Sequence, residues 1–152
     1  MTVEEGLEMM HQKSRDHART PMQWDDSENA GFTTGKPWLH VNPNYKEINV
    51  KEALEDQDSV FYYYQKLIKL RKEHDIIVYG VYNLLEPDHP DLYVYTRTLG
   101  DEKLLVVCNF SDHEVHYQIP EEFAGSECLI TNMEGFKAVD TVPAYGAYVL
   151  KK

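Results

Sequence analysis

Cysteine is scarce in this sequence of 152 residues, in which Cys108 and Cys128 are the only two. They form no CxxC pair, so the sequence gives no support for a zinc site, and we expect neither a metal nor a cofactor. Two isolated thiols in a chain of this size are typical of a reducing compartment, and we therefore expect a cytoplasmic protein.

Basic residues are also few, with 15 Lys and Arg against 26 Asp and Glu and a formal net charge of −11. Phosphate binding needs clustered Lys and Arg, so nucleic acid is excluded as a partner. No apolar run approaches the roughly 20 residues of a membrane span, so we expect no membrane partner. Glu4, Glu5 and Glu8 interrupt the first turns, where a secretion signal would be apolar.

The hydrophobic pattern changes near His74. Before it the periodicity is helical with long polar loops, and after it short alternating apolar runs predominate. Thr2 and Glu5 have the spacing of a helix-capping box, and Asn49 with Glu52 repeats this signal. The predicted helices cover residues 2–12, 49–54 and 58–73.

Short apolar runs after Ile76 predict strands, with turns marked by Gly100-Asp101 and by Pro87–Pro90. Strands at this spacing are typical of an antiparallel sandwich of roughly six to eight strands. The predicted strands are Val78–Leu85, Leu92–Thr98, Lys103–Asn109, Glu114–Ile119, Glu127–Thr131 and Ala147–Leu150.

A long stretch without periodicity separates the first two predicted helices and runs from Ser14 to Tyr45. Loops of this length are uncommon inside a compact domain, and they are usually functional or disordered. We expect this one to be ordered, because it carries aromatic side chains that can anchor it: Trp24, Phe32, Trp38 and Tyr45.

Within this loop, Ser14–Trp24 reads SRDHARTPMQW and concentrates two arginines, an aspartate, a histidine, a glutamine and a tryptophan. Arginine offers five fixed donors that match carboxylates and vicinal hydroxyls. Tryptophan offers a flat apolar face on which a pyranose can stack. By composition alone, an Arg–Asp pair in a loop is more often a structural salt bridge than a ligand site, so both interpretations stay open.

The segment resembles the SRDxARTPMQW motif of the oligo-1,6-glucosidase branch of the α-amylase superfamily, glycoside hydrolase family thirteen. The resemblance covers nearly the whole chain. It continues through NAGFTTGKPW at 29–38, VNPNYKEINV at 41–50 and SVFYYY at 59–64.

This resemblance implies a (β/α)₈ barrel followed by an antiparallel sandwich, and a retaining mechanism that uses a carboxylate nucleophile and a carboxylic acid. In the family the catalytic carboxylates lie upstream of the motif, so we assign no catalytic residue here. We expect a mainly β C-terminal fragment, inactive by itself. Residues 1–75 would be the last loop and helices of an incomplete barrel, and residues 76–152 the C-terminal sandwich domain.

The resemblance also implies a narrow set of substrate-binding residues. Arg15 matches the arginine that helps to fix the non-reducing terminal glucose, beside an aspartate from an early barrel loop. Asp16 and Arg19 match neighbours that line or brace the same pocket. His17 receives no role, and Trp24 is interpreted as a packing residue.

Other carboxylates are interpreted as a solvated acidic surface, because adjacent acids do not face each other across a substrate. They are Asp25-Asp26, Glu55-Asp56 with Asp58, and Glu121-Glu122.

The resemblance predicts that the parent enzyme releases terminal glucose from short α-glucosides, with isomalto-oligosaccharides favoured as the small substrate. The alternative is a non-catalytic carbohydrate-binding or accessory sandwich, which would need an exposed aromatic platform among the tyrosines after Ile76. The apolar helix at 58–73 should either lie on the sandwich or associate with a second copy of the chain.

Overall fold

The computed structural model describes residues 2–13, 15–137 and 140–152. It forms two compact units, Met1–Tyr62 and Tyr63–Lys152. The described residues form antiparallel sheets together with a few helices, which confirms the predicted fold class. The boundary predicted between residues 75 and 76 stays a prediction.

The helices of the first unit begin where the sequence places caps. In α1, Val3–Lys13, the Thr2 amide donates to Glu5 Oε2 at 2.7 Å, and the Glu5 amide donates to Thr2 Oγ1 at 3.1 Å. This reciprocal pair is the predicted capping box. In α2, Val50–Glu55, the Glu52 amide donates to Asn49 Oδ1 at 2.9 Å.

The long loop of the first unit is built from 3₁₀ turns rather than from a packed aromatic cluster. Its turns are η1 (Arg15–Ala18), η2 (Glu28–Gly31) and η3 (Pro43–Lys46). Of the expected anchors, Trp38 is 84% exposed, and Trp24 and Phe32 are half exposed. The loop is instead held by backbone and amide hydrogen bonds.

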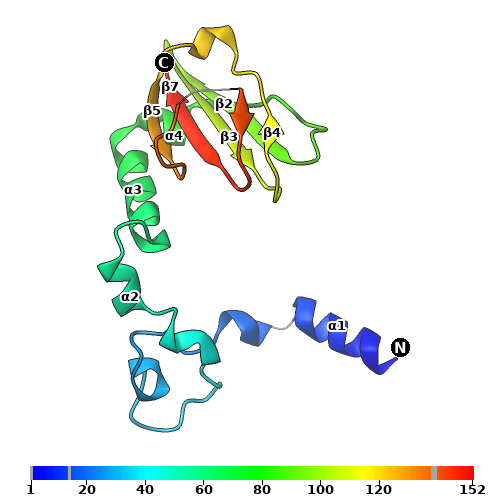
Figure 1. The fold of residues 1–152 in the computed structure, drawn as a ribbon, viewed down its shortest axis with the longest axis vertical. Helices are drawn as coiled ribbons and strands as arrows, with labels where there is room; N and C mark the ends of the chain where they lie inside the picture. The colour runs from blue at the N-terminus through cyan, green and yellow to red at the C-terminus, as the bar shows by residue number, and fades with distance from the viewer. Residues whose placement is uncertain (1, 14, 138–139) are drawn as a thin grey trace. The chain divides into compact units, whose positions relative to one another are not determined.

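The second unit contains a five-stranded sheet in the order β1-β2-β3-β7-β5 and a two-stranded sheet, β4-β6 (Figure 1). All the pairings are antiparallel, and Gly100 (φ +59°) lies in the tight turn between β2 and β3. The strands are β1 (Val81–Leu84), β2 (Leu92–Leu99), β3 (Glu102–Asn109), β4 (Val115–His116), β5 (Glu127–Thr131), β6 (Thr141–Val142) and β7 (Ala147–Lys151).

The core of the second unit lies between the two sheets. Alternate residues of β2, β3 and β7 point into it, as the period of two in a strand requires. Phe123, from the 3₁₀ turn η4 (Glu121–Phe123), lies in the same core. The buried members are Leu92, Val94, Leu105, Val107, Val115, Tyr117, Phe123, Val142, Tyr148 and Leu150.

The opposite face of the five-stranded sheet is covered in part by two helices, α3 (Val60–Glu73) and α4 (Asp75–Tyr79). Leu67, Leu70 and Ile77 from these helices line a cavity of about 120 Å³ together with sheet residues such as Tyr95 and Val149. The C-terminal half of α3 therefore lies on the sandwich, which is the first of the two arrangements expected for this helix.

The prediction of a strand from Val78 is wrong for its first residues. Val78 and Tyr79 belong to α4, and β1 begins only at Val81. The run of β-branched residues is typical of a strand, but tertiary packing overrides it: Ile76 is fully buried, and the helix ends at Gly80.

One further prediction needs correction at the small sheet. The strand expected over Glu114–Ile119 is reduced to the two residues of β4. Its partner β6 was not predicted, because two residues are too few to show an alternating pattern.

Candidate functional site

The three predicted substrate-binding residues lie in or directly after η1. The motif's first residue, Ser14, lies outside the described residues, as does the side chain of His17. Arg15 is exposed, and within the described part of the chain its guanidinium makes no ion pair. The guanidinium of Arg19 forms an ion pair with the Asp16 carboxylate, and the Arg19 amide donates to the Asp16 carbonyl at 3.1 Å.

The structure thus brings Asp16 and Arg19 together and leaves Arg15 separate. Both members of the pair stay about half exposed. An exposed ion pair of this kind contributes little to stability, at most about 1 kcal/mol. Its consequence is geometric, because the pair closes one turn of the backbone and fixes the direction of both side chains.

Trp38 joins this pair from a distant part of the loop. The guanidinium carbon of Arg19 lies 5.8 Å from the centroid of the Trp38 ring, within the range of a cation–π contact. The sequence predicts Trp38 only as a packing anchor of the loop. No sequence pattern signals this contact, because it depends on the path of the intervening loop.

Gln23 connects the end of the motif to η3 and to the start of α2. Its Nε2 donates to Asn44 Oδ1 at 3.1 Å and also to the Ile48 carbonyl. The Val50 amide donates to the Gln23 carbonyl at 2.9 Å. Gln23 was counted in the motif without a role, and here it holds the motif against the NPNY segment.

A left-handed turn shapes the middle of the loop. Asn29, Ala30 and Gly31 all have positive φ, at 54°, 58° and 64°, a conformation that costs roughly 1–2 kcal/mol for residues other than glycine. The Ala30 side chain is buried, and its carbonyl accepts from the Trp24 amide at 2.9 Å. A Cβ on Gly31 would lie 2.8 Å from Asp25 Oδ1, so the turn requires glycine there.

Several of the acidic residues accept hydrogen bonds or form ion pairs. Asp25 accepts hydrogen bonds from the hydroxyl and the amide of Ser27, which lower the pKa of its carboxyl. Asp26 lies 3.5 Å from Lys51 Nζ. Glu122 pairs with Lys103 Nζ at 2.5 Å, and this hydrogen bond lowers the pKa of Glu122. None of these contacts places two carboxyl groups across a substrate.

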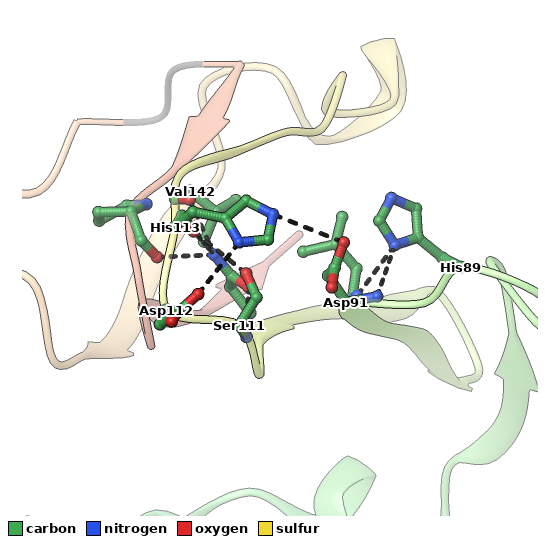
Figure 2. A network of polar contacts seen from close by, with 9 residues as sticks. His89, Asp91, Ser111, Asp112, His113 and Val142 are labelled. Carbon is green, nitrogen blue, oxygen red and sulfur yellow. Dashed lines mark hydrogen bonds and ion pairs between the residues drawn. The ribbon is translucent and has the colours of Figure 1, made fainter.

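A second polar cluster lies at one end of the sandwich (Figure 2). The ring of His113 lies between two carboxylates, with Nε2 3.7 Å from Asp91 Oδ2 and Nδ1 3.3 Å from Asp112 Oδ1. His113 and Asp112 are exposed, and the described residues contain no group of three ligand side chains that could hold a metal ion. We interpret the cluster as bracing for the turns that follow β3.

The buried side chain of Asn109 forms hydrogen bonds with the backbone of that cluster. Its side chain is buried, and Nδ2 donates to the carbonyls of His113 at 2.7 Å, Pro143 at 3.0 Å and Val142 at 3.2 Å. Its Oδ1 accepts from the amide and the hydroxyl of Ser111 at 2.9 and 2.7 Å. The sequence predicts Asn109 only as the last residue of a strand.

The aromatic platform needed by the alternative function is only partly present. Tyr117 and Tyr148 are core residues, whereas Tyr79 and Tyr145 are mostly exposed. Tyr82 and Tyr93 are partly exposed, and their hydroxyls lie 3.1 Å apart and form a hydrogen bond with each other. Among the described residues, no helix is long and apolar enough to cross a membrane.

Comparison with family models assigns the two parts of the chain to different domains. The model described as "Alpha amylase, catalytic domain" matches residues 1–80. The model described as "Maltogenic Amylase, C-terminal domain" matches residues 82–149, which contain the sandwich.

Curated relatives carry the names of glycoside hydrolases. The chain is 59% identical over 133 residues to the oligo-1,6-glucosidase of Parageobacillus thermoglucosidasius, a match that covers 86% of this chain and 24% of that protein. It is 48% identical over 130 residues to the trehalose-6-phosphate hydrolase of Bacillus subtilis (strain 168), covering 83% of this chain and 23% of the relative. The chain therefore spans about a quarter of these relatives.

Solved structures show the same similarity. The isomaltulose synthase of Klebsiella sp. LX3 superposes with a TM-score of 0.94 at 43% identity, over 99% of this chain and 28% of that one. The trehalose-6-phosphate hydrolase of Bacillus licheniformis superposes with a TM-score of 0.89 at 47% identity, over 97% of this chain and 28% of that one.

Proposed function

Because the chain belongs to the α-amylase family, we propose that it is the C-terminal part of a retaining glycoside hydrolase that releases terminal glucose from short α-glucosides. The observation that carries this proposal is the match of residues 1–80 to the catalytic-domain model. The preference for α-1,6 linkages is supported by the oligo-1,6-glucosidases of Parageobacillus thermoglucosidasius and Bacillus cereus, at 59% and 54% identity.

Within that enzyme, Arg15 is proposed to bind the terminal glucose. Its exposed guanidinium has no ion-pair partner among the described residues, so its donors are available to a carboxylate or to sugar hydroxyls. Asp16 and Arg19 are proposed to line or brace the same pocket. Their mutual ion pair supports the bracing role for Arg19, since that pair already engages its guanidinium.

A chimera tests the activity. The upstream part of the Parageobacillus oligo-1,6-glucosidase is joined to this chain at the start of the matched region, which supplies the part of the relative that the chain does not span. We expect the chimera to hydrolyse isomaltose and p-nitrophenyl α-glucoside, and the 152-residue chain alone to hydrolyse neither. A folded chimera without turnover, or inhibitor-sensitive turnover by the chain alone, would overturn the proposal.

The location and association of the chain are further proposals. A cytoplasmic location is supported by the two free thiols, Cys108 and Cys128. Self-association through α3 is supported by the exposure of Tyr64 and Ile68, which lie one turn apart on the helix. Sedimentation of the chain at rising concentration should show a dimer that Ile68→Lys abolishes. A monomer at every concentration contradicts it.

A further inference from the structure

Trp38 is 84% exposed, although tryptophan is among the most expensive side chains to leave in water. Its ring lies over the guanidinium of Arg19, with the guanidinium carbon 5.8 Å from the centroid. The same guanidinium is held by the Asp16 carboxylate. Arg19 is therefore restrained by two different contacts, one with an opposite charge and one with an aromatic face.

Local hydrogen bonds order part of the segment between the motif and Trp38. Asn29 Nδ2 donates to the carbonyls of Thr33 at 3.1 Å and Gly35 at 3.3 Å, and the Gly35 amide donates to Thr33 Oγ1 at 3.1 Å. The ring itself removes little apolar area from water, so hydrophobic burial does not account for its placement. Within the described ranges, the contact with Arg19 is the interaction recorded for this ring.

We propose that Trp38 is a positioning residue of the sugar-binding site, and that it acts through Arg19 on the orientation of Asp16. This inference rests on the proposed function, because it assigns a role within that site. Without the ring, the half-exposed Arg19 side chain loses one of its two restraints. The Asp16 carboxylate then samples more orientations, and a misdirected binding group lowers the rate at which bound sugar reacts.

The expected effect is modest and bounded. Losing one restraint cannot reduce the population of the competent geometry by more than the strength of that restraint. For an exposed cation–π contact this limits the loss to about two- to fivefold in kcat/KM. An aromatic replacement retains the attraction, whereas an aliphatic residue of similar bulk does not.

The test uses the active chimera and p-nitrophenyl α-glucoside, with kcat and KM measured for Trp38→Phe, Trp38→Leu, Arg19→Gln and the double variant. We expect Trp38→Phe to keep the parent value and Trp38→Leu to lose about two- to fivefold in kcat/KM. The double variant should have the same kcat/KM as Arg19→Gln alone, because the guanidinium through which Trp38 acts is already absent. Phe32→Leu, at another exposed aromatic residue of the loop, is the matched control and should be neutral.

The inference is overturned if Trp38→Leu equals the parent, or if it costs as much in the Arg19→Gln background as in the parent. A second readout does not depend on activity. In the chain carrying Trp24→Phe, Trp38 is the only tryptophan, and Arg19→Gln should change its fluorescence. Unchanged emission would show that the contact is absent. An inactive parent chimera refutes the proposed function, whereas normal activity of Trp38→Leu beside a damaged Arg15→Ala refutes only this inference.

Discussion

Replacement of Asn109 by aspartate exchanges a buried amide that donates to three carbonyls for a carboxylate that donates to none. Each lost hydrogen bond costs about 1 kcal/mol, and a buried carbonyl left without a partner costs about 1–3 kcal/mol. We therefore expect the sandwich to lose about 3–5 kcal/mol at neutral pH. For a domain of roughly 60–100 residues, this lowers the melting temperature by at least about 12 °C.

The penalty of Asn109→Asp should also depend on pH. Burial and the three carbonyl oxygens disfavour the charged form, so the folded-state pKa of the introduced carboxyl lies above its unfolded value of about 3.9. Its contribution to stability is present below that value and is lost as pH rises through the folded pKa.

Thermal melts followed by near-ultraviolet circular dichroism at pH 4 and pH 7 measure the destabilisation caused by Asn109→Asp. Each melting temperature is compared with that of the parent chain at the same pH. Asn83→Asp on the edge strand β1, where the side chain is exposed, is the matched control. A variant at Asn109 that melts within about 2 °C of the parent at pH 7, or an equal penalty at both pH values, would refute the reasoning.

Three further changes probe the second unit. Tyr148→Phe should raise the free energy of unfolding by about 1 kcal/mol or more, because the buried Tyr148 hydroxyl has no hydrogen-bond partner within the described residues. Urea unfolding, with Tyr145→Phe as the control variant, checks this prediction, and a loss of stability contradicts it. Gly80→Ala should lower the free energy of unfolding by about 1–3 kcal/mol in the same assay, since a Cβ there would lie 2.4 Å from the Ile76 carbonyl oxygen. The control Gly6→Ala, where a Cβ meets open space, should leave stability unchanged. Burial raises the pKa of Tyr117 to about 12, so the stability of the unit should hold below about pH 10 and fall between about pH 10 and pH 12. The fall with pH should be shallower in Tyr117→Phe, and an equal slope in the variant and the parent would exclude Tyr117 as the cause.

Local chemistry made much of the fold predictable from the sequence. The caps at Thr2 and Asn49 act within three residues of themselves, so their spacing alone located the starts of α1 and α2. Strands β2 and β3 are long enough to show their alternation, and both were predicted nearly to the residue. By contrast, α4 depends on burial of Ile76 against distant strands, which no local pattern reveals.

The candidate site was predictable to a smaller extent. The ion pair between Asp16 and Arg19 joins residues three apart, so a structural salt bridge could be considered from the sequence. The contact of Arg19 with Trp38 joins residues nineteen apart, and the side chain of Asn109 donates to carbonyls more than thirty residues away. These contacts follow from tertiary structure and leave no signal in the sequence.

The most direct test of the central claim is kcat/KM of the chimera with Arg15→Ala, compared with the melting temperature of the same variant in the chimera and in the 152-residue chain. Removing charge-assisted hydrogen bonds to the terminal glucose and its neighbouring carboxylate should cost about 1.5–3 kcal/mol, or roughly ten- to a hundredfold in kcat/KM. An exposed arginine without an ion-pair partner in the described part of the chain should change stability by less than about 0.5 kcal/mol. Unchanged kcat/KM together with a lowered melting temperature in both proteins would contradict the account and make Arg15 a structural residue.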